Sequence, residues 1–222
     1  MHQPMIVSKR VGYSNVTLLV NGSNSVLTDT GVRGGLRQCI NLIKQAGLTP
    51  RDVKLIVLTH THYDHAGNLN ALQKYTGAKV MVHKNEFKDL QNGFTPIPDG
   101  MGSLTGFISR LGRAIIPRFA SPKPFIADLI NENEFDLSPF GIDGRVIHTP
   151  GHTMGSQSVI TGKTIISGDT FINMKSGVNF PHFANDPELL LKTWENIFEM
   201  DLEEIYPGHG PKMPVEKVAL LI

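Results

Sequence analysis

Apolar residues near the start of the chain fall into short runs separated by turn-forming residues. Residues 16–20 and 25–29 form two such runs around Asn21 and Gly22, a pair that favours positive φ and therefore predicts a β-hairpin. A third run, residues 53–58, is rich in β-branched side chains and follows a turn signal. This pattern predicts a buried strand.

Helical spacing of apolar side chains predicts three helices in the first half of the chain. These are residues 36–46, which are followed by Gly47 as a C-cap, residues 69–75 and residues 85–90. The apolar run at residues 79–83 separates the last two helices and predicts another strand. Strands therefore alternate with helices, as expected of an α/β layer.

Short strands return in the second half of the chain. The predicted strands are residues 144–148, 157–160, 164–167 and 204–206. Before the last of them, Asp186 and Pro187 predict the start of a helix that runs to Met200, with Asp186 as the N-cap. No repeat interrupts this order, so we expect residues 1–222 to form a single domain.

Residues 93–130 differ in composition from the rest of the chain. This segment contains five prolines, together with apolar residues at helical spacing beside four basic residues. The pattern predicts an inserted helical flap. The flap could be a solvated helix packed on its own domain, a lid over a functional site, a homodimer contact or a membrane-surface helix, and we favour the lid or the homodimer contact.

Composition narrows the range of partners and compartments. The chain has 21 Lys and Arg against 20 Asp and Glu, a formal net charge of +1, so we expect a small-molecule substrate and no nucleic acid. Cys39 is the single cysteine and lies on an apolar helix face, which indicates a core residue and excludes an intrachain disulfide. Neither a secretory signal nor a membrane-spanning run is evident, so we expect a cytoplasmic protein without membrane contact.

Candidate metal ligands cluster directly after the run at residues 53–58. His60, His62, Asp64 and His65 place four ligand side chains within six positions. A single histidine at a strand end is usually a surface or hydrogen-bonded residue, but four ligands so close together favour a metal site. Because residues two apart in an extended segment point the same way, His60 and His62 can share one ion while Asp64 and His65 serve another.

Three further candidate ligands follow a glycine near the ends of later predicted strands, namely His152, Asp169 and His209. Seven ligands with one shared carboxylate suit two divalent transition-metal ions. Imidazole and carboxylate ligands favour Zn, Fe, Mn or Ni, and we expect zinc, with iron or manganese as alternatives. Two such ions about 3.5–4 Å apart would hold a hydroxide that attacks an electrophilic carbonyl.

These motifs together carry a resemblance to a known family. His-Thr-His-Tyr-Asp-His at residues 60–65, with His152 in Thr-Pro-Gly-His-Thr, Asp169 in Ser-Gly-Asp-Thr and His209 in Pro-Gly-His-Gly, resembles the metallo-β-lactamase-fold hydrolase superfamily. The resemblance implies an α/β (α+β) fold, a four-layer αββα sandwich of two mixed β-sheets flanked by helices.

The same resemblance implies a role for each candidate ligand. It implies one metal bound by His60, His62 and His152, another bound by Asp64, His65 and His209, and Asp169 as the bridge between them. It also implies that Asp29, in Asp-Thr-Gly, supports the ligands from behind.

Differences between branches of the family indicate which branch the chain resembles most. β-Lactamases of this fold generally lack the bridging aspartate, and flavodiiron-type oxidoreductases usually carry glutamate in place of His62, so both are disfavoured. Glyoxalase II enzymes and acyl-homoserine lactonases share the full set of motifs. Glyoxalase II enzymes typically have a C-terminal helical extension, whereas only residues 211–222 follow the last ligand here. The chain therefore resembles a glyoxalase II-like or lactonase-like branch.

We expect a metal-dependent hydrolase in which a dinuclear metal-bound hydroxide cleaves a small ester, thioester or lactone. Asp64 or Asp169 would relay a proton to the leaving group. Two alternatives stay open at this stage. One is a persulfide dioxygenase with a single non-haem iron, and the other is a non-catalytic metal-binding module that contacts another protein.

Overall fold

The computed structural model describes residues 3–95, 121–174 and 183–219, which form two six-stranded β-sheets. The first sheet contains, in spatial order, β1 (Met5–Val11), β2 (Ser14–Asn21), β3 (Asn24–Thr28), β4 (Val53–Val57), β5 (Lys79–His83) and β6 (Leu129–Asn131). The second contains β12 (Met213–Pro214), β11 (Glu204–His209), β10 (Thr164–Ile172), β9 (Gln157–Thr161), β8 (Arg145–His148) and β7 (Glu134–Asp136).

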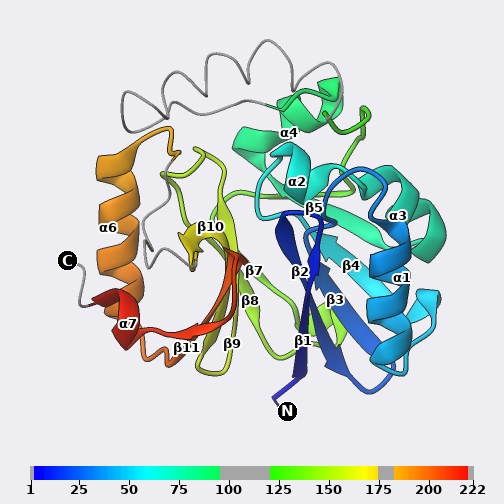
Figure 1. Cartoon of the computed structure of the whole chain (residues 1–222), viewed down its shortest axis with the longest axis horizontal. Helices are drawn as coiled ribbons and strands as arrows, with labels where there is room; N and C mark the ends of the chain where they lie inside the picture. The colour runs from blue at the N-terminus through cyan, green and yellow to red at the C-terminus, as the bar shows by residue number, and fades with distance from the viewer. Residues whose placement is uncertain (1–2, 96–120, 175–182, 220–222) are drawn as a thin grey trace.

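Helices cover the outer faces of both sheets. The helices are α1 (Leu36–Gln45), α2 (Tyr63–Ala66), α3 (Leu69–Thr76), α4 (Lys84–Asn92), α6 (Pro187–Phe198) and α7 (Glu216–Ala219), with short 3₁₀ turns η1 (Pro50–Asp52) and η2 (Ser138–Phe140). Figure 1 shows α1 and α3 beside the first sheet and α6 and α7 beside the second, with the two sheets between them. The predicted αββα sandwich is therefore confirmed.

Both sheets are mixed, as expected. In the first sheet β1, β2 and β3 are antiparallel, whereas β3, β4, β5 and β6 are parallel. In the second sheet the single parallel pair is β10 with β11. Because β3 and β4 are parallel neighbours, their carboxyl ends meet at one edge, and the chain that follows them carries Asp29 and His60 to the same place.

Three hydrophobic clusters fill the interfaces between the four layers. Between the sheets, Leu55 and Val57 of the first pack with Val146 and Val159 of the second. Another cluster joins the first sheet to α1 and α3, and it includes Cys39, which is fully buried as predicted. The last joins the second sheet to α6 and α7. The sheets are thereby held rigidly enough to position the loops at their edges.

The structure corrects the predicted strand before Asp169. We expected that strand to end at Ser167, but β10 continues to Ile172. Its pairing with β11 shifts register on both sides of Gly168, whose φ is 51°. A bulge of this kind re-aims the side chains next to it. Asp169 therefore lies within an irregular strand, not in a loop after a regular one.

Sequence patterning missed the outer strands of both sheets. β1 alternates only weakly between exposed and half-buried positions, because an edge strand has a poorly defined hydrophobic face. β6 begins at Leu129, so a sheet strand overlaps the end of the segment predicted as a flap, residues 93–130. Most of that predicted flap, residues 96–120, lies outside the described residues. Among the helices that are described, none is long and apolar enough to cross a membrane.

Helix α6 begins as the sequence predicts and ends two residues earlier, at Phe198. The Asp186 carboxylate accepts a hydrogen bond from the Leu189 N–H at 2.9 Å, which satisfies one free donor of the first turn. The Asp186 N–H itself donates to the Gly151 carbonyl at 3.0 Å. The N-terminus of α6 is thus tied to the loop that carries His152.

We predict that Asp186→Ala lowers the free energy of unfolding by about 1 kcal/mol, because the N-cap hydrogen bond is lost. For a chain of this size this corresponds to roughly 2–4 °C in Tm. Fluorescence of Trp194, the single tryptophan and a buried residue of α6, reports the transition. Glu195→Ala, an exposed change on the same helix, should shift stability by less than about 0.5 kcal/mol. Equal effects of the two variants would contradict the capping role.

Candidate metal centre

The structure brings all seven predicted ligands to one edge of the sandwich as two groups. One group comprises His60, His62, His152 and Asp169, and the other comprises Asp64, His65 and His209; within each group the ligand atoms lie within 4.8 Å of one another. The ligands come from four separate parts of the chain. They follow β4, follow β8, lie within β10 and end β11.

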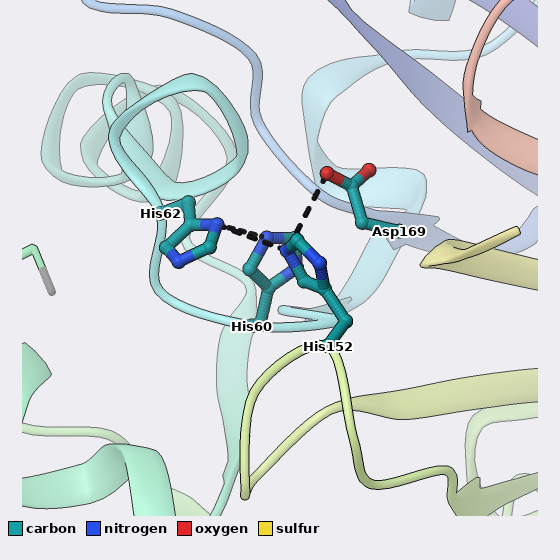
Figure 2. A group of neighbouring side chains, drawn as sticks. All are labelled: His60, His62, His152 and Asp169. Carbon is teal, nitrogen blue, oxygen red and sulfur yellow. Dashed lines mark hydrogen bonds and ion pairs between the residues drawn. The ribbon is translucent and has the colours of Figure 1, made fainter. Parts of the chain in front are cut away.

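Three imidazole nitrogens converge in the first group. His60 Nε2 lies 2.9 Å from His62 Nδ1, and His152 Nε2 lies 3.1 Å from the same His62 nitrogen. Figure 2 shows the three rings facing a common point, with the Asp169 carboxylate approaching from the side. His60 and His62 are two residues apart, and their rings meet at the same point, as the sequence predicts. We name these three residues the three-histidine site.

The second group is built from one short helix and one strand end. Asp64 and His65 are consecutive residues of α2, and His209 is the last residue of β11. His209 Nε2 lies 3.4 Å from Asp64 Oδ2, and His65 Nε2 lies 3.9 Å from the same oxygen. Two nitrogens and one oxygen thus surround a point beside the three-histidine site.

Asp169 lies within reach of both groups. Its Oδ2 is 3.5 Å from His152 Nε2 and 3.2 Å from His209 Nε2, and its Oδ1 is 3.2 Å from His65 Nε2. Gly208 allows this approach, because a side-chain carbon there would collide with Asp169 Oδ1. A carboxylate so placed can contact one ion with each oxygen.

Backbone carbonyls orient two of the ligand histidines. His152 Nδ1 lies 2.8 Å from the Phe183 carbonyl oxygen, and His209 Nδ1 lies 2.8 Å from the Tyr13 carbonyl oxygen. A carbonyl oxygen can only accept, so Nδ1 carries the proton in each ring. In the neutral form of each ring the lone pair therefore lies on Nε2, which faces the other ligands, as metal binding requires.

Asp29 orients a third histidine and supports a fourth through Thr59. The Asp29 carboxylate accepts from His65 Nδ1 at 2.8 Å and from the Thr59 N–H at 2.8 Å. The Thr59 hydroxyl donates to the same carboxylate and leaves its oxygen 3.0 Å from His60 Nδ1. Asp29 thus lies where the resemblance implies, behind the ligands, and contacts none of the converging nitrogens or oxygens.

Burial sets the protonation of the three-histidine site. Burial lowers the pKa of His60 and of His62 well below the usual 6.5, and the neighbouring imidazoles lower each of them further. Burial, again the largest cause, also lowers the pKa of His152. All three rings are therefore neutral at physiological pH, the form that binds metal.

The remaining ligands form an ion-paired set. Burial lowers the pKa of His65, but neighbouring carboxylates, Asp169 first, outweigh it and hold the pKa well above its usual value. Burial raises the pKa of Asp169, yet the charges of His209 and His65 hold it well below its usual 3.8. Asp169 is therefore ionised. A divalent cation bound here would take the place of the proton on His65.

Two buried atoms show that this donor set fits metal ions. His65 Nε2 and Asp169 Oδ1 are buried, and although they lie 3.2 Å apart, neither forms a hydrogen bond, an arrangement that costs free energy unless another ligand satisfies them. The donors are imidazole nitrogen and carboxylate oxygen, which suit divalent transition metals. Two ions would satisfy both orphan atoms and the converging lone pairs of the three-histidine site.

Sequence reasoning missed the groups that orient the histidines. The Phe183 and Tyr13 carbonyls have no sequence signal, because every residue carries a carbonyl oxygen. Thr59 had a weak signal, since it precedes the first ligand and has a hydroxyl that can relay a hydrogen bond. Their identification required the folded positions of segments far apart in the chain.

Comparison with known proteins agrees with this geometry. A probable metallo-hydrolase of Methanocaldococcus jannaschii is 28% identical over 204 residues, covering 90% of this chain and 89% of the relative. A protein of a Bacillus species named N-acyl homoserine lactonase is 25% identical over 180 residues, covering 77% of this chain and 61% of the relative.

A solved structure shares the fold over almost the whole chain. The BLEG-1 B3 metallo-β-lactamase superposes with a TM-score of 0.73 at 24% identity, covering 96% of this chain and 95% of that one. The sequence model of the metallo-β-lactamase superfamily matches residues 10–209, a range that contains every candidate ligand and Asp29. The chain therefore belongs to the metallo-β-lactamase superfamily.

Proposed function

We propose that this protein is a hydrolase that cleaves a small ester, thioester or lactone at a centre of two divalent transition-metal ions. The observation that carries the proposal is the pair of buried ligand groups with Asp169 within reach of both. The relative named N-acyl homoserine lactonase supports a lactone as one of the candidate bonds. Zinc is the proposed metal, and iron or manganese are the alternatives, because the donors are imidazole and carboxylate without a thiolate.

The ions, when bound, would supply a Lewis acid for the substrate carbonyl and acidify a water molecule to a pKa of about 7. The protein would supply fixed ligands and a buried environment around them. The histidines fix the positions of the ions, because the hydrogen bonds described above lock the orientation of His65, His152 and His209. The near-complete burial of the ligands limits competing water.

Asp64 and Asp169 are the proposed proton carriers. Both carboxylates lie among the ligand histidines and are at least nine-tenths buried, and Asp169 is ionised there. The Ser14 hydroxyl donates to the Asp64 carbonyl and fixes the start of α2. A carboxylate held beside the reacting carbonyl can take a proton from the attacking water and deliver it to the leaving group.

The primary test is metal content and turnover of the purified chain. We predict two ions per chain and hydrolysis within a panel of small thioesters, esters and lactones. His62→Ala should reduce the bound metal to one ion and lower turnover by more than about 100-fold, because the loss of a ligand should exceed the effect of losing an outer hydrogen bond. Glu195→Gln, which changes an exposed carboxylate of α6 outside both ligand groups, should keep both ions and full turnover.

Two results would contradict this proposal. A protein that binds a single iron and consumes dioxygen with glutathione persulfide would be a dioxygenase. A protein that binds two ions but turns over no substrate of the panel would favour a metal-binding interaction module.

Asp29 provides a separate prediction about metal affinity. Asp29→Asn should weaken metal binding by about 10–100-fold, because His65 and the Thr59 N–H bond different oxygens of the carboxylate and asparagine replaces one of these oxygens with an NH₂ group. Asparagine tolerates the φ of 63° at this position, so the backbone should be preserved. Competitive titration with a chromophoric chelator measures the affinity. An unchanged affinity, with an unchanged Tm of the metal-free protein, would show that Asp29 does not support the ligands.

A further inference from the structure

Glu86, in the first turn of α4, is a buried carboxylate outside both ligand groups. Its side chain is 3% exposed. One carboxylate oxygen, Oε2, accepts hydrogen bonds from the N–H of Thr61, at 2.9 Å, and from the Thr61 hydroxyl. Thr61 lies between two ligands of the three-histidine site, His60 and His62. Glu86 therefore holds the peptide that joins these two ligands.

The geometry of the Thr61 peptide explains why its hydrogen bonds to Glu86 affect the two ligands. His60 and His62 face the other ligands, whereas the Thr61 side chain faces α4, where its hydroxyl meets Glu86. The Thr61 carbonyl accepts from the buried Thr95 hydroxyl at 3.1 Å. Each polar atom of Thr61 thus has a partner in α4 or in the residues that follow it. Rotation of this peptide would move both ligand rings, and these contacts oppose it.

The first turn of α4 also contacts the loop that carries the third ligand, His152. Asn85 Nδ2 donates to the Met154 carbonyl at 2.9 Å. Gly155 packs so closely on Glu86 that a side-chain carbon at position 155 would collide with Glu86 Cγ. The same turn of one helix therefore contacts both loops of the three-histidine site.

The buried Glu86 carboxylate lacks a cationic partner in the described part of the chain. Across the described residues, no Lys, Arg or His forms an ion pair with this carboxylate. The burial of an unpaired carboxylate is costly unless hydrogen bonds compensate it. Within the described residues, the compensating side-chain hydrogen bonds come from Thr61. A role in holding the ligand loop accounts for a buried carboxyl group that an apolar side chain would otherwise replace at lower cost.

We propose that Glu86 is a positioning residue that holds the three-histidine site in its metal-binding geometry. Glu86 does not touch the ligand nitrogens and acts through Thr61 and Gly155. The inference rests on the metal binding required by the proposed function, and it does not depend on which bond the enzyme cleaves.

The test is a zinc titration of the full-length chain against a chromophoric chelator, which resolves two dissociation constants. We expect Glu86→Ala to weaken zinc binding at the three-histidine site by about 10–100-fold, as for other groups that orient metal ligands. The second dissociation constant should stay within about threefold of the wild-type value. His152→Ala should abolish zinc binding at the three-histidine site, and His209→Ala should affect zinc binding at the second ligand group. These two variants therefore assign the two constants. Glu86→Gln keeps an acceptor oxygen for Thr61 and should restore most of the lost affinity.

A matched control separates positioning from general stability. Asp89→Asn removes a carboxylate from the same helix that hydrogen-bonds neither ligand loop in the described part of the chain, and it should leave both constants unchanged. The Tm measured with excess chelator reports the stability of the metal-free fold. If Glu86→Ala does not fold, Thr61→Val removes one of the two donors to Glu86 and should weaken the same zinc step.

The outcomes are distinct. Wild-type affinity at both sites in Glu86→Ala, or in Thr61→Val where that variant is needed, would overturn the positioning role. Equal weakening of both zinc steps would overturn it as well, since it would indicate a general loss of structure. A wild-type chain that binds no zinc, iron or manganese would instead overturn the proposed function itself.

Discussion

The structure depends on placing seven imidazole and carboxylate side chains, nearly all buried, against one another. Such groups lose hydration on burial, and each needs a hydrogen bond or a metal ion in exchange. The protein meets this constraint in two ways. The outer nitrogens of His65, His152 and His209 donate to fixed oxygens, whereas His65 Nε2 and Asp169 Oδ1, which face inward and lie 3.2 Å apart, form no hydrogen bond. The histidine nitrogens that hydrogen-bond to protein oxygens thus lie outside the ligand atoms that metal ions would bind.

The two sheets make this arrangement rigid. Ligands come from both sheets, so their separations depend on the apolar layer between the sheets more than on any single loop. Helices outside the sandwich then fix the loops. α6 is tied through Asp186 to the loop of His152, and α4 contacts the loops of His60 and His152 through its first turn. The helices therefore act on the metal centre as well as on the hydrophobic core.

Metal chemistry and substrate choice depend on different parts of the molecule. The metallo-hydrolase class follows from the donor set and from membership of the superfamily, because the position and kind of the ligands determine which ions bind and what those ions do. The bond that is cleaved depends on the surfaces beside the ions, which are separate from the ligands. The positioning proposed for Glu86 bears on the metal chemistry, since it concerns how the ions are held.

Local patterns in the sequence determined most of the elements and all the candidate ligands. The hairpin around Gly22, the N-cap at Asp186 and the spacing of His60 and His62 depend on neighbouring residues alone, so they could be predicted. Tertiary structure decided the rest. The bulge at Gly168 arises from pairing between distant strands, and the carbonyl groups that orient His152 and His209 are chemically the same as those of any other residue. Such contacts exist only where the fold brings separate segments together, and a linear pattern therefore carries no signal for them.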